Sequence, residues 1–515
     1  MPPFEHGRSP ERRSDVRWQC AALGLAVLAC SAWYLFAEKL IAGEWGFSLD
    51  DSWIYAVFAR NIATGHGYSF NAGEHIAGAT GPLYALILAL FYALFGDVVL
   101  AAKVLGIACL LASSILMYFA AKALDPRSRI KPVLVGLLVG ISPSLLWSSV
   151  SGMEIPLYVG LASLGILFYV RSRWTLAALC WALGVWVRPD GILLALAGVF
   201  LRPRLGLRSI TASLLVVAPI LAAYFTFNYV VGGTLFPNSV LVKAHPGQNP
   251  GGGIWEMAQQ WVPMWGLSMR RWDFSTHSIL LLPAVVTGGV LLLRRLPAIV
   301  AYALGFPIAL ALAGAGGGAH GRYLMPTIPF AMLLASAGLD RVARRIQPRR
   351  HEPILIVLAV LCLGWQVLAT DRMGRTHGRN VENINHMQRL LGRTLRENTS
   401  VGDTIAVNDV GAIGYFSRCY VVDLVGLVSP RRSFPENLKV YRPKYLVIFP
   451  DWYQEYFTTE NGRSVFYDPD SLYHYVPIVE AGLRFNTISA RDQMFVFGRF
   501  PRGEEGPDRV KMVWN

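Results

Sequence analysis

Long apolar runs separated by charged residues occupy the first 370 residues of the chain. A bilayer crossing needs about 20 mostly apolar residues. Eleven segments approach that length: 19–38, 99–123, 132–150, 155–170, 174–187, 190–201, 209–231, 278–293, 296–313, 323–339 and 353–370. A further apolar run, 81–95, is short for a crossing and fits a helix that lies along the membrane interface. The pattern therefore predicts a polytopic α-helical membrane protein.

The basic residues decide whether the run 81–95 crosses the bilayer. If it stays at the interface and the basic N-terminus is inside, the short cytoplasmic loops become rich in Lys and Arg, as the positive-inside bias requires. These residues are Arg127, Arg129, Lys131, Arg171, Arg173, Arg202, Arg204, Arg208, Arg294, Arg295, Arg341, Arg344, Arg345, Arg349 and Arg350. One more crossing would move all of them outside. We therefore expect eleven spans, a cytoplasmic N-terminus and an extracytoplasmic C-terminus.

The composition turns polar from Asp371 to Asn515. The stretch 381–397 has helical periodicity, whereas 404–407, 420–424, 445–449 and 494–497 are typical of short strands. The chain is thus expected to have three parts: a cytoplasmic tail (1–18), a membrane domain (19–370) with its first outer loop at 41–98, and a soluble extracytoplasmic α/β domain (371–515).

Composition and charge agree with a membrane protein. The chain is 54% hydrophobic and only 16% charged, against about 25% charged in soluble domains, which excludes an ordinary soluble globule. The net charge of +14 would suggest nucleic acid in a soluble chain, but cytoplasmic loops account for it here, so no nucleic-acid partner is expected. The six cysteines have no metal-type spacing.

With this topology, nearly every unusual polar residue of the membrane part lies at an outer span end. Singly, each has an ordinary explanation, since aspartates cap helices and arginines reach lipid head groups. Together they favour one polar cavity open to the outside, because charge near the hydrocarbon is costly unless it faces a cavity or is paired. The candidates are Asp50, Asp51, Tyr55, Arg60, Glu154, Arg188, Asn238, Lys243, His320, Arg322 and Tyr323.

Such a set suits the transfer of a group from a lipid phosphate to a hydroxyl. Asp50 can accept the proton of the attacking hydroxyl as general base, and Asp51 can raise the pKa of Asp50 by repulsion or orient the acceptor. The leaving phosphate needs fixed positive charge, which a planar guanidinium supplies by bidentate hydrogen bonding. Arg322 is the first choice, followed by Arg188 and Lys243, with His320 in the same group. The residues expected to bind substrate are Tyr55, Arg60, Glu154, Asn238 and Tyr323.

The segment after the Asp-Asp pair, ARNIATGHGYSFNAGEHIAGATGPLY, closely resembles the first outer loop of the GT-C superfamily of polyprenyl-phosphate-sugar-dependent glycosyltransferases. Further blocks resemble its arabinofuranosyltransferase-like and mannosyltransferase-like members, in the expected order: SGMEIPLY, WVRPDGIL, PNSVLVKA, HGRYLMPTIP, VNDVGAIGYF and VVDLVGLVSP. The resemblance implies a GT-C membrane core with interfacial helices in the first outer loop. It also implies inverting transfer with a first-loop aspartate as base, for which Asp50 is the better match. Glu154 and Arg322 match family blocks without a fixed role.

The expected activity is transfer of a sugar from a polyprenyl-phosphate donor to a hydroxyl of a cell-envelope glycan or glycolipid, on the outer side of the bacterial cytoplasmic membrane. The resemblance assigns acceptor binding to the C-terminal domain, and the sugar and the acceptor stay open. No cofactor is expected. A divalent metal at the acidic motif is the less favoured alternative, because Arg is available for the phosphate. The rival function is a transporter or flippase for lipid-linked sugars or polysaccharide, which predicts an internal repeat and charges along a path to both faces; neither is evident in the sequence.

Overall fold

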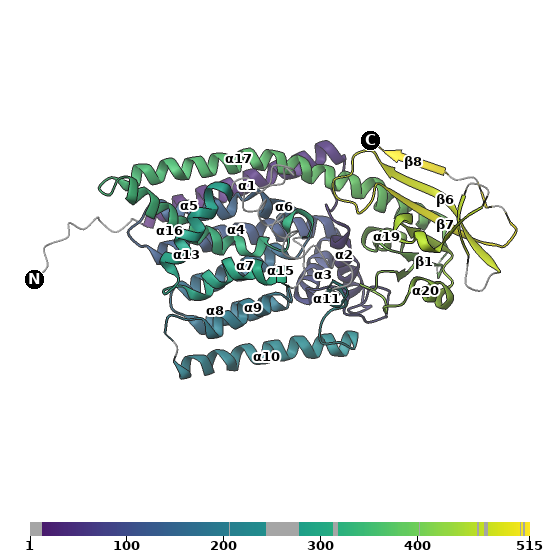
Figure 1. Ribbon diagram of the computed structural model, residues 1–515, viewed down its shortest axis with the longest axis horizontal. Coiled ribbons are helices and arrows are strands. Elements are labelled where there is room, and N and C mark those ends of the chain that lie inside the picture. Colours follow the sequence, from purple (N-terminus) through teal and green to yellow (C-terminus); the bar gives the residue numbers. More distant parts are fainter. Residues whose placement is uncertain are drawn as a thin grey trace, which may run out of the picture.

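The helical part of the chain and a mixed β-sheet lie at opposite ends of the long axis of the computed structural model (Figure 1). The structure describes residues 13–204, 206–243, 278–312, 318–400, 402–460, 463–467, 472–504, 506–507 and 510–514. Most of the expected N-terminal tail, 1–18, lies outside the described residues.

The helical part contains both long and short apolar helices. The long ones are α1 (Arg13–Ala42), α4 (Val98–Leu124), α10 (Leu207–Gly232), α16 (Ile328–Ile346) and α17 (His351–Ile384). The shorter ones are α5 (Ile130–Gly140), α6 (Pro143–Val150), α7 (Ile155–Val170), α8 (Trp174–Val185), α9 (Gly191–Phe200), α13 (Ser278–Leu292), α14 (Pro297–Val300) and α15 (Phe306–Leu312), with the π-turn η1 (Ala301–Gly305) between the last two.

By length and composition, five helical segments of the described chain could cross a membrane: Ser14–Ala42, Val98–Leu124, Leu207–Gly232, Ala319–Ile346 and His351–Asn398. The pair α5–α6, bent by 47°, could form a sixth crossing. Its break has a local cause, because the ring of Pro143 disfavours helical geometry at Ser142. Each of the eleven expected segments contains a long helix, this bent pair or a shorter apolar helix. The count of eleven crossings itself stays a prediction.

A buried ionic cluster ties three helices together inside the helical part. Nζ of Lys103 on α4 lies 2.7 Å from Oε2 of Glu38 on α1, and Nε2 of His377 on α17 lies 2.9 Å from the same oxygen. Lys103 also donates to the carbonyl of Val150, and the other Glu38 oxygen accepts from the backbone N–H of Gly46. Since charges buried without partners are very unfavourable, this cluster specifies how α1, α4 and α17 pack.

Several basic loops meet at the end of the bundle away from the sheet. Lys131 pairs at 2.7 Å with both Asp125 and Asp340, and Asp340 also accepts from Arg344. The turn from α16 to α17 lies at this end, opposite the C-terminal domain (Figure 1). The grouping agrees with the expected clustering of Lys and Arg loops on one side. The placement of that side in the cytoplasm stays a prediction.

The segments between the bundle and the sheet come mainly from residues 41–98, which follow α1 (Figure 1). They are α2 (Asp50–Ala63), α3 (Pro82–Phe95) and, from later in the chain, α11 (Asn238–Lys243). The apolar run expected at the interface is α3, which packs on α2 and α4. Two short turns, η2 (Ala319–Gly321) and η3 (Met325–Thr327), lead into α16.

The C-terminal domain is an α/β domain, as the sequence predicts. Helix α17 runs through the expected boundary at Asp371 without a break and continues into η4 (Asn385–Arg389) and α18 (Leu390–Asn398). The sheet order is β2-β1-β3-β7-β6-β5-β4, with β8 beside β6. Its elements are β1 (Thr404–Val407), α19 (Gly411–Ser417), β2 (Tyr420–Asp423), α20 (Phe434–Tyr441), β3 (Tyr445–Ile448), β4 (Phe457–Glu460), β5 (Arg463–Tyr467), β6 (Tyr473–Leu483), β7 (Gln493–Pro501) and β8 (Val510–Trp514).

The four expected strands correspond to β1, β2, β3 and β7, so these predictions are confirmed to within a few residues. Strands β1, β2 and β3 are parallel, with α19 and α20 as the crossover helices, whereas β7 runs antiparallel to β3. The carboxyl ends of parallel strands share one edge, so the loops after β1 and β2 emerge together. These loops face α2 and the expected site.

Candidate functional site

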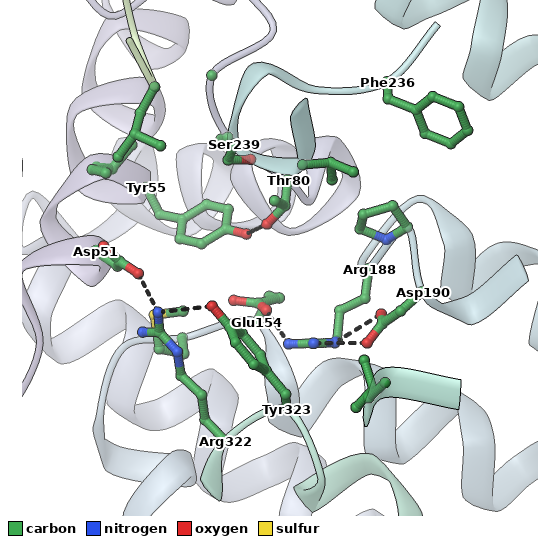
Figure 2. A pocket seen from close by; sticks show the side chains of 18 residues that line it. Asp51, Tyr55, Thr80, Glu154, Arg188, Asp190, Phe236, Ser239, Arg322 and Tyr323 are labelled. Atoms are coloured by element: carbon green, nitrogen blue, oxygen red, sulfur yellow. Dashed lines mark hydrogen bonds and ion pairs between the residues drawn. The ribbon is translucent and has the colours of Figure 1, made fainter. Parts of the chain in front are cut away.

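A cavity of about 350 Å³ lies where α2, the ends of the bundle helices nearest the sheet and the C-terminal domain meet. Figure 2 shows the side chains that line it. Its polar and charged lining residues are Asp51, Tyr55, Thr80, Glu154, Arg188, Asp190, Ser239, Arg322 and Tyr323. Its apolar wall includes Ile54, Met153, Phe236, Val240, Leu310 and Leu427. Since Leu427 follows β2, the C-terminal domain supplies part of the wall.

Asp51 and Arg322 form an ion pair inside this cavity, although 271 residues separate them in the chain. Nη2 of Arg322 donates to Oδ2 of Asp51 at 2.5 Å. The Tyr323 ring lies 5.2 Å from the guanidinium, and its hydroxyl is 3.4 Å from the same nitrogen. Within the described part of the chain, the hydrogen bonds of the Arg322 guanidinium all come from Nη2, and its Nε is buried without a partner, so this cation keeps donors for a ligand. The expected cavity shared by the aspartate pair and Arg322 is thus present for Asp51.

Arg188 has its charge balanced by protein carboxylates on the other side of the cavity (Figure 2). Its Nη1 donates to Oε1 of Glu154 at 2.7 Å, and its Nε and Nη2 donate to the two oxygens of Asp190 at 3.1 and 2.8 Å. Arg188 and Asp190 both lie in the turn between α8 and α9, and Glu154 is the residue that precedes α7. Because two carboxylates already hold this guanidinium, it has less capacity than Arg322 for a phosphate.

Asp50 points away from the cavity, towards the C-terminal domain. Its Oδ2 accepts from the backbone N–H of Gly411 and its Oδ1 from that of Ala412, both at 2.7 Å. Burial raises the pKa of Asp50, and the nearby carboxyl of Asp409 adds to the rise. The two adjacent aspartates therefore occupy different environments, and of the pair only Asp51 lines the cavity in the described structure.

Three of the expected substrate-binding residues line the cavity: Tyr55, Glu154 and Tyr323. The Tyr55 hydroxyl is 2.6 Å from Oγ1 of Thr80, a residue that the sequence analysis did not single out. Asn238 begins α11 and donates its backbone N–H to Ala77, and its neighbour Ser239 lines the cavity.

Arg60, His320 and Lys243 are not among the lining residues that the structure describes. Nη1 of Arg60 donates to the carbonyl of Tyr415 at 2.8 Å, so Arg60 binds the C-terminal domain. Nε2 of His320 lies 2.7 Å from the side-chain nitrogen of Asn380 on α17. Lys243 is the last residue of α11, and its side chain lies outside the described residues.

Sequence reasoning missed Thr80, Asp190, Ser239 and Leu427 as lining residues. Each belongs to a block that carries the family resemblance: ATGPLY, WVRPDGIL, PNSVLVKA and VVDLVGLVSP. The blocks were thus a signal for these positions. Among the described residues, no group of three or more His, Cys, Asp or Glu side chains could hold a metal ion. The expectation that no metal takes part stays a prediction.

Comparison with known proteins establishes the class of fold. Residues 379–497 match the model of a domain of unknown function (DUF8728). No curated protein matches the sequence of the chain. The fold is similar to that of ArnT from Cupriavidus metallidurans in the apo state, with a TM-score of 0.55 and 15% identity over 93% of this chain and 98% of that one.

Two further solved structures share the fold. ArnT from Cupriavidus metallidurans bound to undecaprenyl phosphate has a TM-score of 0.50 and 14% identity, over 94% of this chain and 99% of that one. The Archaeoglobus fulgidus oligosaccharyltransferase, tethered with an acceptor peptide, has a TM-score of 0.54 and 12% identity, over 84% of this chain and 69% of that one. The chain therefore has a GT-C-like fold, as the sequence motifs indicated. At these identities the likeness concerns the fold alone.

Proposed function

We propose that this protein is a membrane glycosyltransferase that moves a sugar from a lipid-phosphate donor to a hydroxyl acceptor. The observation that carries the proposal is the contact of Asp51 with Arg322 in a cavity between the membrane helices and the C-terminal domain. A base beside a cation with free donors suits attack by a hydroxyl and departure of a phosphate. The similarity to an ArnT structure bound to undecaprenyl phosphate supports a polyprenyl-phosphate donor.

In the proposed reaction, Asp51 is the general base. The acceptor oxygen attacks the anomeric carbon and forms the new glycosidic bond while its proton passes to Asp51. The bond from this carbon to the phosphate oxygen breaks, and the polyprenyl phosphate leaves with the bonding electrons. Attack opposite the leaving group inverts the anomeric centre. We assign the base to Asp51 rather than Asp50, because both Asp50 oxygens accept backbone N–H groups and face away from the cavity.

Arg322 is the proposed ligand of the leaving phosphate. Its Nη1 donors can bind phosphate oxygens while Nη2 stays with Asp51. A fixed donor of this kind stabilises developing charge by about 3 kcal/mol. Arg188, with Glu154 and Asp190, instead shapes the opposite wall. Lys243 and His320 stay candidates for support of the phosphate, since α11 and η2 adjoin the cavity wall.

The membrane placement is part of the same proposal. The positive-inside pattern favours a cytoplasmic N-terminus, eleven spans and a C-terminal domain outside a bacterial cytoplasmic membrane. The acceptor would then be a hydroxyl of a cell-envelope glycan or glycolipid, and the C-terminal domain would contact it beside Leu427. This mechanism places the phosphate charge on Arg322 and calls for no metal ion.

The test is transfer by the purified protein in lipid nanodiscs. It is given a panel of synthetic polyprenyl-phosphate sugars, and mass spectrometry of lipid-linked sugars and envelope glycans from a deletion strain selects the acceptor. We expect one donor to be consumed with release of polyprenyl phosphate, and EDTA to leave the rate unchanged. Translocation of intact lipid-linked sugar without cleavage would instead support the transporter function. Loss of activity in EDTA that Mg²⁺ or Mn²⁺ restores would contradict the metal-free mechanism.

A further inference from the structure

One oxygen of the Glu154 carboxylate is left without a partner at the cavity. Glu154 lines the cavity, and its side chain is only 3% exposed. Its Oε1 accepts from Nη1 of Arg188 at 2.7 Å, whereas its Oε2 is buried and has no hydrogen-bond partner among the described residues. Figure 2 shows the carboxylate pointing into the space between the lining side chains. A buried acceptor without a donor costs free energy, so this oxygen favours a ligand that donates a hydrogen bond to it.

The chemistry of this oxygen limits the groups that it can bind. In its ion pair with Arg188, Glu154 is a carboxylate, which accepts hydrogen bonds and donates none. A sugar hydroxyl donates a hydrogen bond and therefore fits. The ionised carboxyl group of a uronic acid is itself only an acceptor and carries the same charge, so it is repelled. Since Arg188 already balances the charge of Glu154, an uncharged donor is sufficient.

The charges around the cavity act against an acidic sugar in the same way. The described lining residues include three acids, Asp51, Glu154 and Asp190, and two cations, Arg188 and Arg322. Arg188 is paired with both Glu154 and Asp190. Arg322 is paired with Asp51 and is the proposed ligand of the phosphate. A carboxylate on the sugar would therefore find no further cation among these residues.

Tyr323 connects the proposed phosphate site with Glu154. The centre of its ring is 5.2 Å from the guanidinium of Arg322 and 5.8 Å from that of Arg188. Arg188 in turn holds Oε1 of Glu154. One aromatic ring thus adjoins both cations, and a sugar whose phosphate binds Arg322 is within reach of the unpaired oxygen of Glu154.

We propose that Glu154 selects the donor sugar by accepting a hydrogen bond from one of its hydroxyls at Oε2, and that this sugar is uncharged rather than a uronic acid. The assignment rests on the proposed function, because it places the phosphate of the donor at Arg322. Glu154 then contacts the substrate, and Arg188 is a positioning residue that fixes the Glu154 carboxylate. A sugar that lacks the hydroxyl leaves Oε2 unpaired in the complex and binds more weakly.

Donor binding without an acceptor tests this selection, because no transfer is needed for the measurement. The wild-type protein in lipid nanodiscs is given polyprenyl phosphate alone and its derivatives with neutral sugars (arabinose, xylose, glucose, mannose and galactose), with uronic acids (glucuronic, mannuronic and galacturonic acid) and with glucosamine. Native mass spectrometry gives the dissociation constants. We expect a neutral sugar to bind most tightly, and at least about tenfold more tightly than any uronic acid. Tightest binding by a uronic acid or by glucosamine, or no gain from any sugar over polyprenyl phosphate, would overturn the proposal.

Glu154→Gln identifies the residue responsible for the selection. The amide keeps Oε1 for Arg188 but replaces Oε2 with an NH₂ group, which donates a hydrogen bond. The neutral sugar that the wild-type protein prefers should bind about tenfold more weakly, and its preference over the uronic acids should fall below about threefold. Polyprenyl phosphate alone should bind as before.

The matched control is Glu397→Gln, which changes an exposed glutamate of α18 and should keep the full preference. A preference that is unchanged in Glu154→Gln would overturn the role of Glu154. Equal weakening of all ligands, polyprenyl phosphate included, would show that Glu154 has a structural role only and would overturn it as well.

The transfer assay separates this selection from the proposed function. A preference for a neutral sugar that depends on Glu154, without transfer to any acceptor, overturns the glycosyltransferase and leaves the sugar site. Transfer of a uronic acid, or transfer of a neutral sugar by Glu154→Gln with the wild-type kcat/KM, overturns the sugar selection alone.

Discussion

Asp50 and Asp51 are consecutive residues of α2, but their carboxylates contact different parts of the protein. Asp50 accepts the backbone N–H groups of Gly411 and Ala412 in the C-terminal domain, whereas Asp51 accepts from Arg322 in the cavity. Successive residues of an α-helix point about 100° apart, so one dipeptide can serve both purposes. The Asp-Asp pair is thus one docking residue followed by one residue of the proposed active site.

Asp51→Asn should abolish most of the sugar transfer. The amide keeps the shape and the contact with Arg322 but accepts no proton, and loss of a general base commonly costs on the order of 10² to 10⁴ in rate. We expect kcat to fall with little change in thermal stability. Asp50→Asn should instead destabilise the docked domain, since one backbone N–H would face the new NH₂ group, at a cost of about 1–3 kcal/mol. Transfer rates and thermal unfolding of both variants check the assignment, and the reverse outcome would return the base to Asp50.

The helices, several of the strands and parts of the candidate site could be predicted from the sequence. Apolar runs bounded by charged residues located the helices, and β1 to β3 were recognisable as short runs rich in β-branched and aromatic residues, although α19 and α20 between them were not predicted. The positions of Asp51, Arg322 and Tyr323 at span ends also indicated a shared cavity. These signals are local in the sequence, which is why they were sufficient.

The choice between Asp50 and Asp51 could not be made in this way. It depends on the rotation of α2 about its axis, and that rotation is set by contacts with α19, 361 residues away. Arg60 shows the same limitation, because its partner is the carbonyl of Tyr415 in the other domain. Spacing identifies which residues are near the site but not the direction in which each side chain points.

Replacement of Arg322 should weaken use of the donor in a graded way. Arg322→Ala removes the guanidinium, and we expect kcat/KM for the lipid donor to fall on the order of 10²-fold or more, in line with about 3 kcal/mol for such a donor. Arg322→Lys keeps the charge without the planar fork and should retain an intermediate activity. Steady-state kinetics with varied donor measure both. Arg375→Ala, at an exposed ion pair on α17, is the control, and wild-type kinetics for both Arg322 variants would place the phosphate elsewhere.

The Glu154–Arg188 pair should matter for stability more than for phosphate binding. Arg188→Ala leaves two carboxylates without their cation, and breaking a buried pair costs about 3–5 kcal/mol. The double variant Glu154→Gln with Arg188→Gln should recover part of this loss, because Asp190 is then the one carboxylate of this group that has lost its cation. Chemical unfolding in detergent gives the coupling. If the Arg188→Ala variant instead has wild-type stability and binds the donor poorly, this result would show that Arg188 binds the phosphate.

Lys103→Met should be among the most destabilising single substitutions in the helical part. The side chains of Lys103 and Glu38 are only 3% and 0% exposed, so removal of the ammonium leaves Glu38 with the His377 ring and the backbone N–H of Gly46 as hydrogen-bond partners. We expect a loss of about 3–5 kcal/mol, much of it restored in the double variant Glu38→Gln with Lys103→Met, since a neutral pair then replaces a broken ionic one. Lys39→Met, at the exposed neighbour of Glu38 on α1, should change stability little. The measurement is the unfolding temperature of each variant in the same detergent. Equal effects of Lys39→Met and Lys103→Met would show that the buried cluster does not hold α1, α4 and α17 together.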